Sequence, residues 1–375
     1  MVSRALRVLI VPDKFKGTMS ARQAAKAIAA GWHIARAHDE LELLPMADGG
    51  DGFGEILGAL LGAEPFICDT VDAAGRPCRA RWWWSATTGT ALLEAAQVNG
   101  LALLPTAHYH PYDLDTYGLG DVLRAIAAHR PARLYVGIGG SATNDGGFGM
   151  ARALGWRFLD ARGCALIRWT DLNTLARIEA PDHTLELGEV VIAVDVSNPL
   201  LGPQGASRIY GPQKGLRQED MAHAESCLIR LAAVVANYSG MDIASMPGAG
   251  AAGGLGFGLR AFCAGRFESG AAIFSDLAQL PARIAVADWV VTAEGALDEQ
   301  SLMGKGVGAI AAAADQAGKP CICLAGSVTA GLSGPWSQFT AYAIVPQVAE
   351  LTRALAEPET CLQQLAHSVA AGLKV

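Results

Sequence analysis

Aromatic residues are scarce in this chain of 375 residues, at only 7% of the sequence. Hydrophobic residues nevertheless make up 51%, so alanine, leucine, valine and glycine must supply most of the packing. Such small side chains suit helices that lie closely on a parallel sheet, and we therefore expect an α/β enzyme. The length allows two domains, or one large α/β domain.

The chain also lacks an excess of positive charge. It has 29 basic and 36 acidic residues, a formal net charge of -7 and no long basic run. Non-specific binding to nucleic acid needs a basic surface, so we expect no nucleic-acid partner.

Several further patterns are missing from the sequence. No apolar run is long enough to span a bilayer, and Asp13 and Lys14 interrupt the first short apolar run before any cleavage-like site. The eight cysteines lack the paired spacing of zinc or thioredoxin-like sites. We expect a cytoplasmic protein without a membrane partner. There is no GxxxxGK[ST] motif, so any kinase chemistry must use a different phosphate cradle.

The most informative stretch is GIGGSATNDGGFG, residues 137–149, which lies between a strand-like run and a helix-like run. Its six glycines permit positive φ angles and a close approach of a ligand to the main chain. A helix N-terminus also favours anions, because its unpaired N–H groups point outward. We predict an anion or substrate cradle with the polar side chains Ser141, Thr143, Asn144 and Asp145. The alternative is an ordinary turn capped by Asn144 or Asp145.

Short apolar runs that read as buried strands end in charged or glycine-rich loops. In open α/β sheets, ligands bind beyond the carboxyl ends of the strands, so residues of the first two such loops are expected to face one crevice. These residues are Asp13, Lys14, Lys16, Asp48 and Asp51. A later strand, 190–194, delivers Asp195 beside a tight turn that contains Asn198, and Asp195 is a candidate general base. For any single aspartate, a helix cap is the alternative.

Two further segments place glycines beside possible ligand contacts. IYGPQKG, residues 209–215, contains Lys214, which could be a point charge for an anion or a solvated surface residue. Residues 247–258, PGAGAAGGLGFG, contain GxGxxG spacing. No strand directly precedes this spacing and no acidic residue follows at the usual distance, so it is a weak dinucleotide signal. We interpret the segment as a hinge or a nucleotide-facing loop.

The two ends of the chain share a pattern of strands, glycine-rich loops and helices. Strand-like runs at 288–292, 321–324 and 343–345 repeat the succession of strand, loop and helix of the N-terminal segment. From about residue 64 the sequence pattern changes to a series of strand-like segments with alternating hydrophobicity. We predict that both termini contribute to one sheet and that a second domain is inserted between them.

Eight motifs occur in one order along nearly the whole chain: DKFKGTMSARQAAKAIAAG, PMADGGDGF, TYGLGDVL, GIGGSATNDGG, DVSNPLLGPQGAS, GPQKG, GAGAAGGLGFG and EGALDEQSLMGKG. Together they resemble the bacterial glycerate kinases of the glyoxylate and aldarate pathways. The resemblance implies a Rossmann-like parallel-sheet domain at 1–63 and 275–375, with an α/β domain inserted at 64–274. It also implies an active site in the cleft between them, and transfer of phosphate from ATP, with magnesium, to the 2-hydroxyl of D-glycerate.

The resemblance further implies roles for individual residues, because this reaction mainly needs alignment of the hydroxyl and neutralisation of developing charge. We assign Asp195 as the base, Lys16, Lys214 and Lys305 to phosphate charge, and Asp48, Glu294 and Asp298 to magnesium. Glycerate is assigned to Ser141, Thr143, Asn144, Asp145 and Asn198, and the nucleotide to Lys14, Gly253, Gly254 and Lys305. Where family members often carry GEGRLDGQS, this chain has Ala293, Ala296 and Glu299. A basic side chain is therefore missing, so either Lys305 compensates or the substrate differs.

Other functions remain open from the sequence. The kinase could act on the 3-hydroxyl or on a related small hydroxy acid. A nicotinamide-dependent oxidoreductase and a non-catalytic sensor of a small acid are more remote alternatives. Carboxylates in several strand-end loops argue against simple anion binding, because uncompensated acids repel an anion, whereas magnesium could bridge them to phosphate. The formation of a homodimer is also left open.

Overall fold

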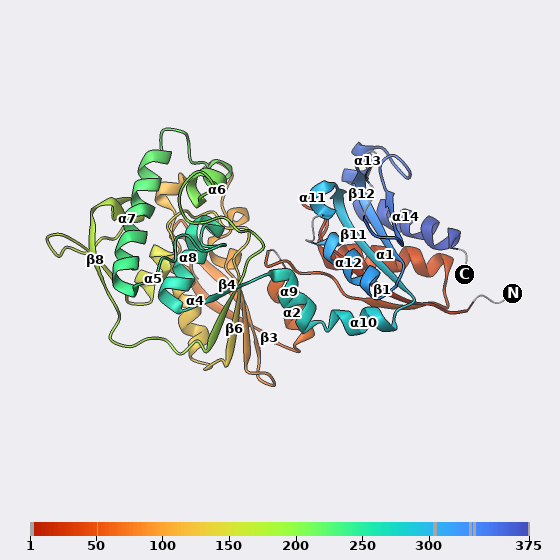
Figure 1. The fold of residues 1–375 in the computed structure, drawn as a ribbon, viewed down its shortest axis with the longest axis horizontal. Coiled ribbons are helices and arrows are strands. Elements are labelled where there is room, and N and C mark those ends of the chain that lie inside the picture. Colours follow the sequence, from red (N-terminus) through yellow and green to blue (C-terminus); the bar gives the residue numbers. More distant parts are fainter. Residues whose placement is uncertain (1–3, 51, 303–305, 330–331, 333–334, 374–375) are drawn as a thin grey trace. The chain divides into compact units, whose positions relative to one another are not determined.

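The computed structural model describes residues 4–373 except 51, 303–305, 330–331 and 333–334 (Figure 1). The chain forms two compact units. Unit 1 combines Met1–Ala47 with Ala271–Val375, and unit 2 is Asp48–Gly270. Both units contain parallel strands together with helices, which confirms the α/β prediction.

Unit 1 is built on a five-stranded sheet in the order β13-β12-β11-β1-β2, with every neighbouring pair parallel. Its strands are β1 (Arg7–Pro12), β2 (Glu40–Leu43), β11 (Trp289–Leu297), β12 (Cys321–Val328) and β13 (Phe339–Ala343). Five of the six residues of β1 are buried, as expected for a central strand of a parallel sheet. The prediction that both ends of the chain share one sheet is confirmed.

Helix α1 (Ala21–Ala35) packs against α14 (Pro358–Gly372) and joins the two chain ends in one core. Ser20 followed by Gln23 three residues later is the sequence signal of a capping box, and the helix begins there: the Ser20 side chain accepts the Gln23 N–H while the Gln23 side chain accepts the Ser20 N–H. A Cβ at Gly31 would lie 2.1 Å from the Gln363 carbonyl oxygen, so only glycine permits this contact. The remaining helices are α9 (Gly270–Leu277), α10 (Leu280–Val286), α11 (Glu299–Leu302), α12 (Val307–Gln316) and α13 (Leu351–Ala356).

Unit 2 contains a six-stranded sheet in the order β10-β9-β6-β5-β4-β3. The strands are β3 (Glu64–Val71), β4 (Pro77–Ser85), β5 (Thr90–Glu94), β6 (Arg133–Gly137), β9 (Glu189–Ala193) and β10 (Arg266–Glu268). The four strands from β5 to β10 pair in parallel, whereas β3 and β4 are antiparallel. Strands β7 (Arg157–Asp160) and β8 (Leu175–Glu179) form a separate hairpin-like pair.

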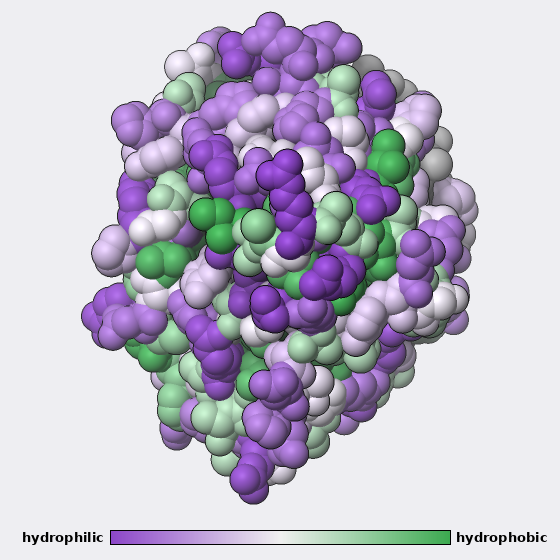
Figure 2. All heavy atoms as spheres, turned by 90° about the vertical axis from the view of Figure 1, so that its left-hand side faces the viewer, coloured by the Kyte–Doolittle hydropathy of each residue, from purple (hydrophilic) through white to green (hydrophobic). Residues whose placement is uncertain are grey.

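The helices of unit 2 divide its interior into two apolar cores. They are α2 (Phe53–Leu60), α3 (Ala96–Asn99), α4 (Tyr117–Ala127), α5 (Phe148–Ala153), α6 (Ala206–Lys214), α7 (Met221–Ser239) and α8 (Ala251–Cys263). Helix α8 serves both cores, since Phe257 packs with residues of α5 and α7 while Leu255 and Leu259 pack with the sheet. On the face that carries α7 and β8, polar residues predominate and apolar ones are scattered (Figure 2).

The first boundary between the units lies before α2, whereas the sequence placed it after that helix, near residue 64. Unit 2 begins at Asp48 because α2 is attached to the second sheet. A Cβ at Gly54 would lie 2.0 Å from the Trp83 ring, and the Gly54 N–H donates to the Glu94 carboxylate at 2.7 Å. Both partners are distant in sequence, so local patterns could not reveal this attachment.

Trp82, Trp83 and Trp84 alternate across β4, because successive side chains of a strand point to opposite faces of the sheet. Trp83 packs on α2, while Trp82 and Trp84 lie against His129. Among the residues that the structure describes, no helix is long and apolar enough to cross a membrane.

Candidate functional site

The two glycine-rich segments of the sequence are packing partners inside unit 2. A Cβ on Gly253 would lie 1.9 Å from the Thr143 carbonyl oxygen, and one on Gly254 would lie 2.8 Å from the Cα of Gly146. Gly146 also donates its N–H to the Gly253 carbonyl at 3.1 Å. The glycines therefore allow two backbones to touch. Gly253 and Gly254 are buried in this contact, and the predicted role of their segment as a hinge or a nucleotide-facing loop stays a prediction.

Asp145 lies at the centre of the loop and is fully buried. Its carboxylate accepts the N–H groups of Thr116, Gly147 and Gly149 at 2.9, 3.1 and 2.9 Å, and the Thr116 hydroxyl at 2.8 Å. These bonds join the start of α4 to the start of α5. The carboxylate therefore holds the loop in place, and its predicted contact with the substrate stays a prediction.

Other predicted substrate contacts in this loop are also turned inward. The hydroxyls of Ser141 and Thr143 share a hydrogen bond of 3.0 Å, and Ser141 donates to the Ala252 carbonyl at 3.3 Å. Asn144 is fully buried and donates from Nδ2 to Ser207 at 2.9 Å, while its Oδ1 has no hydrogen-bond partner among the described residues. The loop is thus a structural junction, and the contacts with glycerate that we predicted for these side chains stay a prediction.

Lys214 ends α6 in the interior of unit 2, with only 7% of its surface exposed. Its Nζ donates to the Thr143 carbonyl at 2.6 Å. Burial lowers the pKa of Lys214 to about 7, although the nearby charge of Asp145 acts in the opposite direction. The amine is therefore engaged within the protein, and its predicted contact with a phosphate stays a prediction.

Replacing Lys214 with methionine should change how stability depends on pH. The folded pKa is about 7 against an ordinary value of 10.5, so the unfolded chain binds more protons between these values. Wild-type stability therefore gains a contribution from Lys214 as pH rises through that window. We expect the free-energy difference between variant and wild type to change by about 2 kcal/mol from pH 7 to pH 9. Urea titrations at both pH values measure this.

The matched control for this experiment is Lys319→Met, because Lys319 also donates from Nζ to a backbone carbonyl, that of Ala287, at 2.7 Å. It should leave the pH dependence close to that of the wild type. Parallel pH profiles for the wild type and Lys214→Met would show that the Lys214 ammonium is not desolvated in solution.

The carboxyl ends of β5, β6, β9 and β10 meet at one edge of the unit 2 sheet, because these strands are parallel. At this edge Asp195 accepts the Ser269 hydroxyl at 2.7 Å. The next residue, Gly270, lies so close to Asp48 that a Cβ on it would be 2.5 Å from the Asp48 carbonyl oxygen. The structure thus brings Asp48 and Asp195 to the same edge through Ser269, a residue that the sequence did not indicate.

Asn198 follows Asp195 in this edge loop and is held by two hydrogen bonds. Its Nδ2 donates to the Gln204 carbonyl at 2.9 Å, and its Oδ1 accepts the Tyr210 hydroxyl at 2.6 Å. The side chain therefore shapes the loop, and its predicted contact with glycerate stays a prediction.

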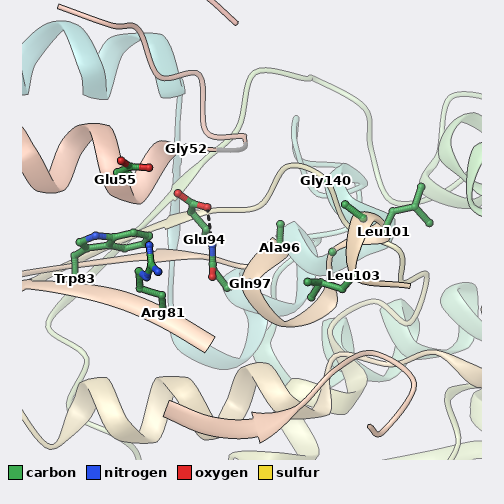
Figure 3. Close-up of a pocket in the computed structure, with 12 residues that line it drawn as sticks. Gly52, Glu55, Arg81, Trp83, Glu94, Ala96, Gln97, Leu101, Leu103 and Gly140 are labelled. Carbon is green, nitrogen blue, oxygen red and sulfur yellow. Dashed lines mark hydrogen bonds between the residues drawn. The ribbon is translucent and has the colours of Figure 1, made fainter. Parts of the chain in front are cut away.

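A cavity of about 550 Å³ opens in unit 2 beside the same edge (Figure 3). Glu94 ends β5 within it, and the Glu94 carboxylate accepts the Gly54 N–H at 2.7 Å and Gln97 Nε2 at 3.2 Å. Further lining residues are Gly52, Glu55, Arg81, Trp83, Ala96, Gly100, Leu101, Ala102, Leu103 and Gly140. We did not predict this site from the sequence, although Glu94 carries the same signal as Asp195, an acid at the end of an apolar strand.

Unit 1 presents its own acidic group where its strand order reverses. In the sheet, β2 lies next to β1 on one side and β11 lies next to β1 on the other. The carboxyl ends of β1 and β11 therefore form a topological switch point, where ligands bind in open α/β sheets. Asp13 follows β1 and donates its N–H to Ala293 at 2.8 Å, which places it beside Glu294 on β11. Asp298 follows β11 and accepts the Ser301 N–H at 3.0 Å.

Glu294 is a partly buried carboxyl of this acidic group, and its surroundings raise its pKa. Burial raises its pKa to about 7, the Ser301 hydroxyl lowers it, and the charges of Asp13 and Asp298 raise it further. Its Oε1 is buried without a hydrogen-bond partner in the described part of the chain. A buried carboxyl with an unused oxygen at a switch point is a candidate functional group.

The predicted metal and phosphate ligands are distributed over both units. Glu294 and Asp298 belong to unit 1, with Asp13 as an unassigned neighbour, whereas Asp48 belongs to unit 2. Within the described ranges, no three acidic, histidine or cysteine side chains are arranged as a ready metal site. Lys14 and exposed Lys16 flank the buried Phe15 in the turn after β1. Asp51 and Lys305 lie outside the described residues.

The fold and these sites define a two-unit α/β protein with acidic groups beyond the ends of parallel strands. Several known proteins are similar to it in sequence. The model of the glycerate kinase family matches residues 8–374. A glycerate kinase from Halalkalibacterium halodurans is 35% identical over 97% of each chain, and the glycerate 2-kinase of Escherichia coli is 37% identical over 86% of each. The crystal structure of a "putative glycerate kinase 2" from Salmonella typhimurium superposes with a TM-score of 0.83, at 33% identity and over 98% of each chain.

The chain belongs to the glycerate kinase family, as the ordered motifs predicted, and it is a kinase. The sequence at residues 293–299, which differs from the motif GEGRLDGQS that family members often carry, is therefore a variation within the family.

Proposed function

We propose that the protein transfers the γ-phosphoryl group of ATP to the 2-hydroxyl of D-glycerate, producing 2-phosphoglycerate in the cytoplasm. Glycerate as the acceptor follows from the family. The observation that carries the choice of the 2-hydroxyl is the 37% identity to a relative named glycerate 2-kinase. Phosphoryl transfer from a nucleotide is supported by the carboxylates at the unit 1 switch point, with two lysines in the turn after β1.

Magnesium fits the residues of unit 1. It prefers oxygen ligands, and in nucleotide enzymes it is commonly held by one or two carboxylates together with phosphates and water. Asp13, Glu294 and Asp298 offer this donor set, and Glu294 has a buried oxygen without a partner among the described residues. When bound there, the ion would neutralise charge on the phosphates. Lys14 and Lys16 would add positive charge at the same edge.

Asp195 remains the proposed general base. The Ser269 hydroxyl donates to one of its oxygens, which fixes the orientation of the carboxylate at the edge of the sheet. A carboxylate held in this way can accept the proton of a substrate hydroxyl as the hydroxyl attacks the phosphoryl group. Ser269 is then a positioning residue.

The product assay tests this proposal. Purified protein with ATP, magnesium and D-glycerate should yield 2-phosphoglycerate, which phosphorus NMR distinguishes from 3-phosphoglycerate. Asp195→Asn should lower kcat about 100-fold or more, because it removes the proton acceptor. Asp69→Asn, at a side chain with 90% exposure, is the control and should retain activity. Formation of 3-phosphoglycerate would move the assignment to the other hydroxyl, and full activity of Asp195→Asn would exclude it as the base.

A further inference from the structure

We propose that the cavity around Glu94 in unit 2 binds the nucleoside part of the nucleotide cosubstrate. This inference rests on the proposed function, since it presupposes a nucleoside triphosphate as the phosphoryl donor. It assigns the nucleoside to the inserted unit, whereas the family resemblance of the sequence implied nucleotide contacts at Lys14, Gly253, Gly254 and Lys305.

The size of the cavity favours a nucleoside over the acceptor. At about 550 Å³ it lies within the range of pockets that enclose drug-sized ligands. Glycerate has only seven non-hydrogen atoms and would leave most of this volume to water. A base with its ribose fills the space far more completely.

The charge of the residues that line the cavity also favours the nucleoside over glycerate. Glu55 and Glu94 contribute two carboxylates, and Arg81 contributes one guanidinium. Figure 3 shows Glu94 in the middle of the cavity, Arg81 and Glu55 around it, and the leucines at the other end. An excess of carboxylates opposes the entry of a small anion such as glycerate. The nucleoside half of ATP is uncharged and meets no such barrier.

The polar groups at the centre suit a ribose diol. Glu94 is buried, with 5% of its surface exposed, and is oriented by donors from Gly54 and Gln97 at 2.7 and 3.2 Å. A carboxylate accepts hydrogen bonds from hydroxyl groups, and a ribose diol supplies two such donors. Carboxylates that end a strand bind ribose hydroxyls in this way in other nucleotide sites.

The apolar end of the cavity suits a base. Leu101 and Leu103 are 42% and 44% exposed, although they are large apolar residues, and they line the cavity together with Ala96 and Ala102. A planar base laid against them would cover this exposed surface. Gly52 and Gly140 form part of the rim, and both belong to loops at the sheet edge that carries Asp48 and Asp195. The phosphates can therefore extend from the cavity toward the proposed base.

Leu103→Glu tests the assignment in the full-length protein. It replaces part of the apolar surface that would contact the base by a hydrated, charged side chain, at an exposed position and without opening the core. We expect the Kd for ATP, measured by calorimetry without glycerate, to rise about tenfold or more. The KM for glycerate and the melting temperature should stay near wild-type values. Ile229→Glu on α7, at 51% exposure, is the matched control and should change neither ligand's affinity.

A second variant tests the contact with ribose. The wild type should bind ATP about tenfold or more tightly than 2′,3′-dideoxy-ATP, because the analogue leaves Glu94 without its hydroxyl partners. Glu94→Gln, which retains an acceptor for the Gly54 N–H, should reduce this preference. A KM increase for glycerate in Leu103→Glu, with unchanged ATP affinity, would overturn the inference and make the cavity the acceptor site. Equal binding of the two nucleotides by the wild type would also overturn it.

Failure of the proposed function would be recognised separately. If the wild type neither binds nor uses a nucleoside triphosphate, the donor assignment itself fails before any variant is made. If the wild type uses ATP but the cavity variants leave ATP affinity unchanged, only the location of the nucleoside is refuted.

Discussion

Replacing Gly253 with alanine should lower the free energy of unfolding by about 4 kcal/mol, which is a large part of the total stability of a typical domain. Two effects add at this position. The φ angle of +70° is unfavourable for residues with a Cβ, and the new methyl group would lie 1.9 Å from the Thr143 carbonyl oxygen. That oxygen belongs to backbone and also accepts Lys214 Nζ, so it cannot move away independently. Urea unfolding monitored by circular dichroism measures the loss.

Gly240→Ala separates the two effects. Gly240 has a φ of +72°, almost the same as that of Gly253, but a Cβ there would meet nothing within 4 Å. We expect this control to lose only about 1 kcal/mol, which is the contribution of the backbone conformation. The remaining difference reports the contact between the two glycine-rich segments. Equal losses in both variants would mean that the segments do not pack so closely in solution.

Glu294→Gln should decrease activity while increasing stability at high pH. If Glu294 holds the metal ion and the phosphates, its loss should lower kcat/KM by about 100-fold or more. The ionised carboxylate is unfavourable in the fold, since burial and the charges of Asp13 and Asp298 raise its pKa to about 7 from an ordinary 4.5. The folded state therefore binds more protons between these values, and wild-type stability decreases as pH rises through that window.

The neutral amide removes this unfavourable charge. After allowing for partial exposure, we expect Glu294→Gln to be more stable than the wild type by about 2 kcal/mol at pH 8, with a much smaller difference at pH 5. Kinetic assays and urea titrations at the two pH values provide both readouts. Glu350→Gln, at an exposed position, should alter neither. A variant that keeps full activity would remove Glu294 from the site, and one destabilised at both pH values would indicate a purely structural role.

Opposing effects on activity and stability are the expected signature of a functional group that the fold does not need. Asp145 should behave in the reverse way. Its four hydrogen-bond donors stabilise the carboxylate within the loop, so its removal should destabilise unit 2 whatever its effect on substrate binding. The two acids are thus distinguished by their surroundings.

Local sequence patterns determined several elements of this protein. The apolar run of β1 predicted a buried strand, and Ser20 with Gln23 predicted the first turn of α1, because both signals depend on neighbouring residues. The recurrence of such units at both ends of the chain predicted the shared sheet of unit 1. The ordered motifs predicted the family.

Only the tertiary structure decided which of the candidate groups are enclosed and which lie at the edge of a sheet. Asp145 and Asp195 both follow buried strands, yet Asp145 is enclosed by donors that include Thr116, while Asp195 lies at a sheet edge beside Ser269. In the same way, Gly253 serves the contact with Thr143, and Glu94 lines a cavity formed with residues from β4 and α2. These outcomes depend on partners far away in sequence. Residue type and spacing therefore indicated which groups could carry chemistry, and long-range packing determined which of them are buried and which are exposed to a substrate.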